Sequence, residues 1–364
     1  MEFGRRAVAG LGLKGMTGFW RDRPVFVTGH TGFKGGWLTT LLHRLGAVTT
    51  GYALAPEPGP SLFEAARIDG LGASVIADIR NGERLAAEMA KAQPEVVLHL
   101  AAQALVRRAR AEPDETFETN VMGTVRLLEA VRRTPSVKAV IVVTSDKVYD
   151  NHEWPWAYRE TDVLGGKEPY GASKAACEMV VQAWRHSYFG EGPYLATARA
   201  GNVIGGGDWS EDRLVPDAMR AFMAKQPLVI RNPAAVRPWQ HVLEPLAGYL
   251  RLAEAMMADD TLPDEAAFNF GPEGQDARSV AWIADAVAAR WGEAAGWTQD
   301  PATQPYEARL LEVDSARARA VLGWSPRWGV EEGLDRTVAW YKAVAAGHDA
   351  RAVTLAQIED HLNG

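Results

Sequence analysis

The stretch PVFVTGHTGFKGGW, residues 24–37, decides the fold. Its first five residues are mainly apolar and β-branched, which is typical of a buried strand. Glycines follow at Gly29, Gly32 and Gly35, and apolar residues from Trp37 to Leu45 then recur at helical spacing. A strand, a glycine turn and a helix in this order predict the start of a βαβ unit that binds a dinucleotide.

The alternation of strand and helix patterns continues along the chain. Apolar runs predict strands at residues 48–54, 75–77, 95–100 and 137–143, and helical spacing predicts helices at 84–92 and 113–133. This order predicts an α/β fold with a Rossmann-type, doubly wound parallel sheet. Beyond Arg199, glycines and prolines indicate loops and short elements, and a further helix is expected at 337–344.

The change in character near residue 200 suggests two lobes. We expect a leader or disordered N-terminus at 1–18 and an NAD-binding Rossmann domain at 19–200. Residues 201–364 are then mainly a smaller, mixed α/β C-terminal lobe for the substrate, with some segments returning to the Rossmann domain. Residues after Gly347 either dock as a helix or fray.

Composition narrows the classes of function. The chain has 364 residues and a formal net charge of −7, which argues against a general attraction to nucleic acid. No apolar run is long enough for a membrane span, so we expect no membrane partner. The single cysteine, Cys177, excludes an internal disulfide and a cysteine-based metal cluster, and fits a reducing, cytoplasmic setting. We expect no metal site.

The glycine turn predicts how the dinucleotide is held. Glycine permits a tight turn and close approach of a pyrophosphate, and the helix that follows presents unpaired amides to it. The turn residues expected to bind the cofactor are Gly29, Thr31, Gly32, Phe33, Lys34 and Gly35. Lys34 is open to two readings, a phosphate partner or a solvated surface lysine.

The adenosine end of the cofactor is less clearly marked. The strand at 48–54 lacks the acid that usually holds the ribose, and Glu57 reaches it only if the loop folds back. No arginine or lysine lies in that segment to meet the extra phosphate of NADP, so NAD is favoured. Asp78 and Ile79, after the third strand, are expected at the adenine ring, although Asp78 could equally cap a helix.

Two polar clusters carry the candidate chemistry. Tyr170 and Lys174 are four residues apart and share one face of a helix. An ammonium and a positive nicotinamide nearby would lower the pKa of the phenol, which makes Tyr170 a candidate base. The strand at 137–143 ends in Thr144, Ser145, Asp146 and Lys147, at the edge of the sheet where ligands bind.

Several motifs together resemble those of the extended short-chain dehydrogenase family of nucleotide-sugar enzymes. The motifs are the glycine turn, His99-Leu100-Ala101-Ala102, Asn120-Val121-Met122-Gly123-Thr124, Thr144 to Tyr149, Tyr170 with Lys174, and Arg199-Ala200-Gly201-Asn202-Val203. The match covers nearly the whole chain from Phe19 onward. It implies that NAD contacts Leu100, Ala101, Ala102, Asn120, Thr144, Tyr170 and Lys174.

Within that family, the pair Asp146-Lys147 resembles the 4,6-dehydratases. Those enzymes have an acid and a second proton-transfer group at this place, whereas 4-epimerases have non-acidic residues. The glycine turn with its His30 and Lys34, and the segment from Arg237 to Val242, are similar to the branch that acts on CDP-glucose.

The expected reaction follows from the roles of five residues. Tyr170, paired with Lys174, takes the proton of the carbon 4 hydroxyl, while Ser145 steadies the keto oxygen. Lys147, if it is held neutral, then removes the proton on carbon 5, and Asp146, if it is protonated, gives a proton to the departing carbon 6 hydroxyl. Because neighbouring strand residues point to opposite faces, both reach the substrate only if the strand has ended.

Two alternatives remain open at the level of sequence. An NAD-dependent nucleotide-sugar 4-epimerase would use the same Tyr170 and Lys174 but would not need Asp146-Lys147. A non-catalytic dinucleotide sensor could share the fold, since fold alone does not specify function.

The substrate and the assembly are predicted more loosely. Arg213 and Arg237 suit the pyrophosphate of a nucleotide sugar because guanidinium groups pair with phosphate oxygens, and Asn202 is grouped with them. The resemblance implies a homodimer formed by the helix that carries Tyr170 and the helix around Asn120.

Overall fold

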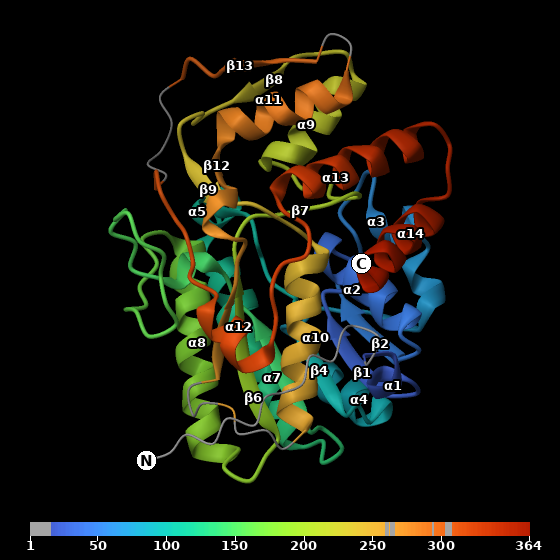
Figure 1. Cartoon of the computed structure of the whole chain (residues 1–364). Coiled ribbons are helices and arrows are strands. Elements are labelled where there is room, and N and C mark those ends of the chain that lie inside the picture. The colour runs from blue at the N-terminus through green and yellow to red at the C-terminus, as the bar shows by residue number, and fades with distance from the viewer. Residues whose placement is uncertain (1–15, 259–261, 263–265, 293–294, 303–307) are drawn as a thin grey trace.

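The computed structural model describes residues 16–258, 262, 266–292, 295–302 and 308–364 (Figure 1). Its centre is a seven-stranded sheet in the order β11-β6-β5-β4-β1-β2-β3, and every pair of neighbours is parallel. The Rossmann-type, doubly wound parallel sheet is therefore confirmed. Its strands are β1 Pro24–Thr28, β2 Val48–Ala53, β3 Ala73–Ile76, β4 Val96–His99, β5 Ala139–Val143, β6 Tyr194–Ala200 and β11 Ala267–Phe270.

Helices and short turns surround this sheet. They are α1 Met16–Trp20, α2 Phe33–Arg44, α3 Leu62–Ala65, η2 Ile68–Leu71, α4 Gly82–Ala92, α5 Val106–Ala111, α6 Pro113–Phe117, η3 Glu118–Met122, α7 Gly123–Arg132, η4 Asp146–Val148, α8 Pro169–Tyr188, α10 Leu243–Met257 and α12 Ala316–Leu322.

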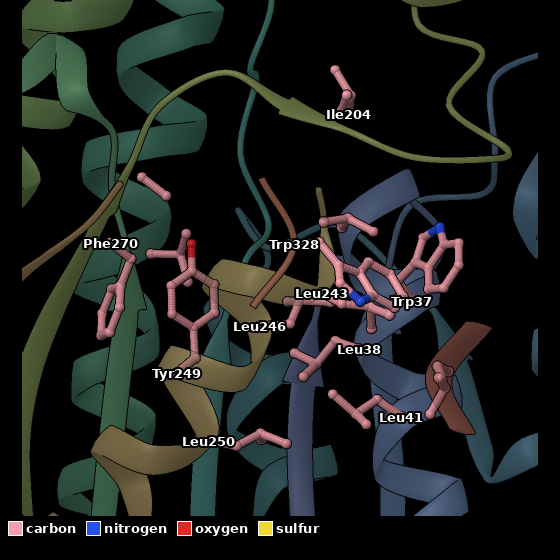
Figure 2. Packing of buried hydrophobic residues seen from close by; sticks show 14 of the residues in the cluster. Trp37, Leu38, Leu41, Ile204, Leu243, Leu246, Tyr249, Leu250, Phe270 and Trp328 are labelled. Carbon is pink, nitrogen blue, oxygen red and sulfur yellow. The ribbon is translucent and has the colours of Figure 1, made fainter. Parts of the chain in front are cut away.

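Alternate side chains of each central strand enter two different cores. In β1, Val25 and Val27 join a cluster with α2 and α10, whereas Phe26 joins a cluster with α4 and α7. Figure 2 shows part of the first cluster, to which α2 contributes Trp37, Leu38 and Leu41 and α10 contributes Leu246 and Leu250. Burial on both faces explains why the strands read as unbroken apolar runs in the sequence.

The predicted helix at 113–133 is present but interrupted. α6 leads into η3, a π-helical turn at Glu118–Met122, and α7 then continues to Arg132. A π turn holds one more residue than an α turn, so it rotates the apolar face of α7 relative to that of α6. The apolar spacing does not reveal such a turn.

Short elements form a lobe above the carboxyl ends of the strands (Figure 1). β8 pairs with β13, and β9 pairs with β12, close to α9 and α11. β7 and β10 pair beneath this lobe. The elements are β7 Val203–Ile204, α9 Leu214–Met223, β8 Leu228–Ile230, β9 Val236–Pro238, β10 Gln240–His241, η5 Gly274–Asp276, β12 Ala277–Ser279, α11 Val280–Trp291 and β13 Trp297–Gln299.

The last two helices, α13 Val330–Ala345 and α14 Ala350–Asn363, close the fold. The residues after Gly347 thus dock as a helix. In α14, buried His361 bonds Glu244 of α10 through Nε2 and Oε1, 3.0 Å apart, and Glu359 forms an ion pair with Arg44 of α2. The C-terminal segment is therefore anchored on the helices that cover the first strand.

Of the predicted leader, residues 1–18, residues 1–15 lie outside the described residues. Residues 16–18 belong to the start of α1. Across the part of the chain that the structure describes, no helix is long and apolar enough to cross a membrane.

Candidate active site

The glycine turn lies between β1 and α2 and leaves no room for side chains. Gly29 has φ +79°, and a Cβ there would lie 2.8 Å from the nitrogen of Ala101. A Cβ on Gly35 would lie 2.0 Å from the carbonyl oxygen of Gly29. The turn therefore packs directly on the end of β4 and leads into the amino end of α2, which fits the pyrophosphate of a dinucleotide.

A cleft of about 1560 Å³ opens at the carboxyl ends of the strands, and it is lined by both lobes. All but one of the predicted site residues line it. They are Gly29, Thr31, Gly32, Phe33, Lys34, Gly35, Asp78, Ile79, Leu100, Ala101, Ala102, Thr144, Ser145, Asp146, Lys147, Tyr170, Lys174, Asn202, Arg213 and Arg237.

Asn120 is the exception, and its prediction as a cofactor contact needs correction. It does not line the cleft, and its buried amide is fully used inside the protein. Its Nδ2 donates to the carbonyl oxygen of Gln103 and to Oγ of Ser173, and its Oδ1 accepts from the amide nitrogen of Gln103. Asn120 thus braces Gln103, which does line the cleft, against α8.

The strand β5 ends at Val143, before the catalytic candidates begin. Ser145 caps the short turn η4, and its Oγ accepts from the amide of Lys147 at 3.2 Å. Because the backbone has left the strand and turned, Asp146 and Lys147 both line the cleft although they are adjacent. The condition that the strand must end before Asp146 and Lys147 is therefore met.

Asp146 is a buried carboxyl group with an unsatisfied oxygen. Its Oδ1 accepts from Oγ of Ser145 at 3.0 Å, while Oδ2 is buried without a hydrogen-bond partner. Burial raises the pKa of Asp146, and Lys147, Ser145, Arg237 and Lys34 oppose this shift. The carboxyl group is therefore biased towards its protonated form, as a proton donor requires.

Tyr170 and Lys174 lie on α8 and are both buried. Nζ of Lys174 donates to the carbonyl oxygen of Val143 at 3.0 Å, and burial lowers the pKa of this amine. Burial raises the pKa of Tyr170 to about 12, and a hydrogen bond with Ser145 opposes the rise. The lowered tyrosine pKa expected from the sequence is thus not produced by the residues of the chain, because desolvation outweighs its neighbours.

A buried ion pair between α8 and β6 supports the end of β5 and the helix that carries Tyr170 and Lys174. Glu178, one turn beyond Lys174, binds Arg199 of β6 through two hydrogen bonds of 2.8 and 3.0 Å. The same carboxylate accepts from the hydroxyl groups of Thr144 and Thr197. The end of β5 is therefore tied to α8 and β6 at one point.

Lys34 points into the cleft rather than to solvent. Its Nζ lies 3.5 Å from the hydroxyl of Tyr249 on α10, whose ring lies in the core shown in Figure 2. Burial, together with the charges of Arg213 and Lys174, lowers the pKa of Lys34 to about 7, although Asp146 and Asp208 oppose the shift. The reading of Lys34 as a solvated surface lysine is wrong.

The adenosine end contains cations that sequence reasoning missed. Asp78 does not cap a helix; it pairs with Arg80 at 2.6 Å, and Arg80 lowers the pKa of Asp78. Glu57 lines the cleft, and Arg108 of α5 donates to it at 3.2 Å. Arg108 lies 51 positions from Glu57 in sequence, so a search around the second strand does not find it.

The substrate side of the cleft is also basic. Arg213 forms an ion pair with buried Asp208 at 3.1 Å, and Arg237 donates to the carbonyl oxygens of Val236 and Ala308. Asn202 also lines the cleft, and its backbone oxygen accepts from the amide of Gln240. Arg107 of α5 also lines the cleft and was missed by the sequence analysis. Among the described residues, no group of three histidine, cysteine, aspartate or glutamate side chains is arranged to hold a metal.

The fold and the cleft define an enzyme scaffold of the extended short-chain dehydrogenase class. Residues 26–337 match the GDP-mannose 4,6 dehydratase family, and the chain belongs to that family. It is 48% identical over 351 residues to the CDP-glucose 4,6-dehydratase of Salmonella typhimurium, covering 95% of this chain and 98% of that protein. It is 28% identical to the dTDP-glucose 4,6-dehydratase of Neisseria gonorrhoeae, over 72% of this chain and 79% of that protein.

Solved structures share the fold across both dehydratases and epimerases. An epimerase of Methanothermobacter thermautotrophicus superposes with a TM-score of 0.79 at 22% identity, covering 92% of this chain and 96% of that one. The dTDP-glucose 4,6-dehydratase of Bacillus anthracis, solved with NAD, has a TM-score of 0.73 at 21% identity, covering 90% and 99%. The fold by itself does not separate the two reactions.

The tight glycine packing makes a prediction about stability. Gly35→Ala should destabilise the protein by about 2 kcal/mol, the size expected for overpacking, because the new methyl group meets the Gly29 carbonyl. Gly32→Ala is the matched control, since its Cβ would lie 3.5 Å from the same oxygen. Denaturant unfolding of both variants measures the difference, and equal stabilities would contradict the packing described.

The raised pKa of Asp146 predicts a pH-dependent gain in stability on its removal. Above the ordinary aspartate pKa, the unfolded chain ionises this carboxyl more readily than the folded protein does, so its ionisation costs folding free energy. Asp146→Asn should therefore raise the melting temperature at neutral pH, and the gain should shrink as the pH falls below the usual aspartate range. A gain that is the same at every pH would contradict this interpretation.

Proposed function

We propose that this protein dehydrates CDP-glucose to CDP-4-keto-6-deoxyglucose, with NAD as a regenerated cofactor. The observation that carries the proposal is the placement of Asp146 and Lys147 together at the cleft, just beyond the end of β5 and beside Ser145 and Tyr170. An epimerase has no use for an acid that protonates a leaving hydroxyl group. The relative from Salmonella typhimurium, which is nearly half identical, supports the choice of CDP-glucose.

The glycine turn and the ends of β3, β4 and β5 would hold NAD, which would supply a hydride acceptor for carbon 4 and a hydride donor for carbon 6. Tyr170 takes the proton of the carbon 4 hydroxyl, and Ser145, in hydrogen-bond contact with Tyr170, stabilises the oxygen as it becomes a ketone. Lys174, held by the carbonyl of Val143, keeps an ammonium donor beside this group.

Elimination then uses the turn η4. The ketone acidifies the hydrogen on carbon 5, and Lys147 removes it as a proton. The bond from carbon 6 to its oxygen breaks, and Asp146 gives that oxygen a proton, so that water leaves. When hydride is returned to carbon 6, Lys147 gives its proton back to carbon 5, so that the sugar has lost one water and nothing else. The raised pKa of Asp146 supports this role, because a carboxyl group must hold its proton until the oxygen departs.

The substrate's pyrophosphate would lie between the lobes. Arg213 and Arg237 line that part of the cleft, and Asn202 lies with them. Since Arg237 is buried and held by backbone carbonyls, its guanidinium is already oriented before a phosphate arrives.

The test is incubation with NAD and, separately, CDP-, dTDP- and UDP-glucose and GDP-mannose. We expect turnover of CDP-glucose to a product lighter by one water, read by mass spectrometry, and much slower turnover of the others. An unchanged mass with an inverted hydroxyl at carbon 4 would replace this proposal with an epimerase, and no turnover of any sugar would favour a sensor. Asp146→Asn serves as the internal check: it should slow water loss while leaving reduction of bound NAD by the sugar detectable.

We also propose that the protein is a cytoplasmic homodimer formed by α8 and the α6-η3 segment. Large apolar side chains are exposed on these helices, and such side chains on a surface are typical of an interface. They are Phe117, Met122, Met179 and Tyr188. The cytoplasm is where NAD and nucleotide sugars are supplied.

The dimer is tested by placing a charge on its expected interface. Met179, 56% exposed on α8, is replaced by glutamate, and Met223→Glu on α9 is the control outside that surface. Light scattering coupled to size exclusion should give twice the chain mass of 39.6 kDa for the natural sequence and the control, and a smaller mass for Met179→Glu. A natural chain that elutes as a monomer would contradict the proposal.

A further inference from the structure

The end of β2 carries no acidic residue where one would normally bind the adenosine ribose. Ala53 and Leu54 occupy that position, and the hydroxyl of Thr31 in the glycine turn donates to the carbonyl oxygen of Leu54 at 2.9 Å. This bond ties the start of the loop after β2 to the cofactor turn. Three residues further on, Glu57 lines the same cleft.

The guanidinium of Arg108, which also lines the cleft, forms a hydrogen bond with Glu57. Arg108 lies on α5, beyond the end of β4, and its Nη1 donates to Oε1 of Glu57 at 3.2 Å. The rest of the guanidinium is already engaged, because Nη2 and Nε donate to Glu115 and Nε also reaches Glu112 at 3.3 Å. Glu115 and Glu112 thus aim the remaining Nη1 at Glu57.

We propose that Glu57 and Arg108 form the element that selects NAD over NADP. Glu57 takes the place of the missing acid at the end of β2 and accepts the ribose hydroxyls. It also occupies the Arg108 donor that would otherwise bind a 2′-phosphate. This inference rests on the proposed function only in taking the cleft as an NAD site.

Charge explains the direction of the selection. The 2′-phosphate of NADP adds about −1.5 to −2 charge and strong acceptor oxygens. Arg108 is shared by three carboxylates, Glu57, Glu112 and Glu115, so this cluster has an excess of negative charge. A guanidinium that loses one of those partners becomes a good phosphate ligand, because its paired donors match phosphate geometry.

The experiment measures binding of NAD and of NADP separately, without sugar, at low ionic strength, by calorimetry. Glu57→Gln keeps the size of the side chain and removes its charge. We expect the ratio of the NADP dissociation constant to the NAD dissociation constant to fall about tenfold, which corresponds to roughly 1.4 kcal/mol. Adding Arg108→Gln to Glu57→Gln should abolish most of the gain in NADP binding.

The control is Glu191→Gln, the same change of charge on an exposed residue between α8 and β6, at the opposite end of the sheet from the cleft. An equal ratio in Glu57→Gln and Glu191→Gln would overturn the proposal, as would a gain that survives Arg108→Gln. Because the readout is cofactor binding alone, its failure is distinguishable from a failure to dehydrate CDP-glucose.

Discussion

One buried carboxylate, Glu178, is the constraint on which the arrangement of the proposed catalytic residues depends. Its two oxygens bind the guanidinium of Arg199 and the hydroxyls of Thr144 and Thr197, so all of its acceptor sites are used. An ionised group is stable in such a place only when it is fully paired, and Arg199, the largest of the opposing influences, holds the pKa of Glu178 below its usual range against the effect of burial. Since Thr144 immediately precedes Ser145, and Glu178 lies one turn beyond Lys174, the hydrogen bond from Thr144 to Glu178 links the end of β5 to α8.

The network continues from the sheet into the loops that support the substrate side. Arg199 also donates to the hydroxyl of Tyr149, and that hydroxyl donates to Oδ1 of Asn269 in β11. β11 comes from the C-terminal half of the chain yet forms the edge of the Rossmann sheet. The substrate lobe is therefore not a separate module placed on a finished domain. The proposed catalytic residues and the strand that completes the sheet are connected through shared hydrogen bonds, which makes their positions mutually dependent.

The parts of this protein that follow from local pattern were predictable, and those that depend on distant contacts were not. The βαβ start, the strands up to Val143 and the lining of the cleft by Ser145 to Lys147 follow from apolar runs, glycine spacing and the ends of strands. Asn120 was wrongly assigned because an amide braced by Gln103 looks the same in sequence as one that binds a ligand. Arg108 was overlooked because its partner Glu57 belongs to another loop. The pKa of Tyr170 was expected to fall because of the charges of Lys174 and the nicotinamide. Among the residues of the chain burial dominates this pKa, and burial cannot be read from the spacing of a tyrosine and a lysine.

The docking of α14 has a consequence for how the protein is made. During synthesis the glycine turn and α2 leave the ribosome early, but α10 follows some two hundred residues later, and the helix that bears Glu359 and His361 later still. Contacts between such distant segments are slow to form, and apolar surface waits exposed until they do. Trp37 and Leu41 therefore lack part of their apolar surroundings until the C-terminal half of the chain has been made.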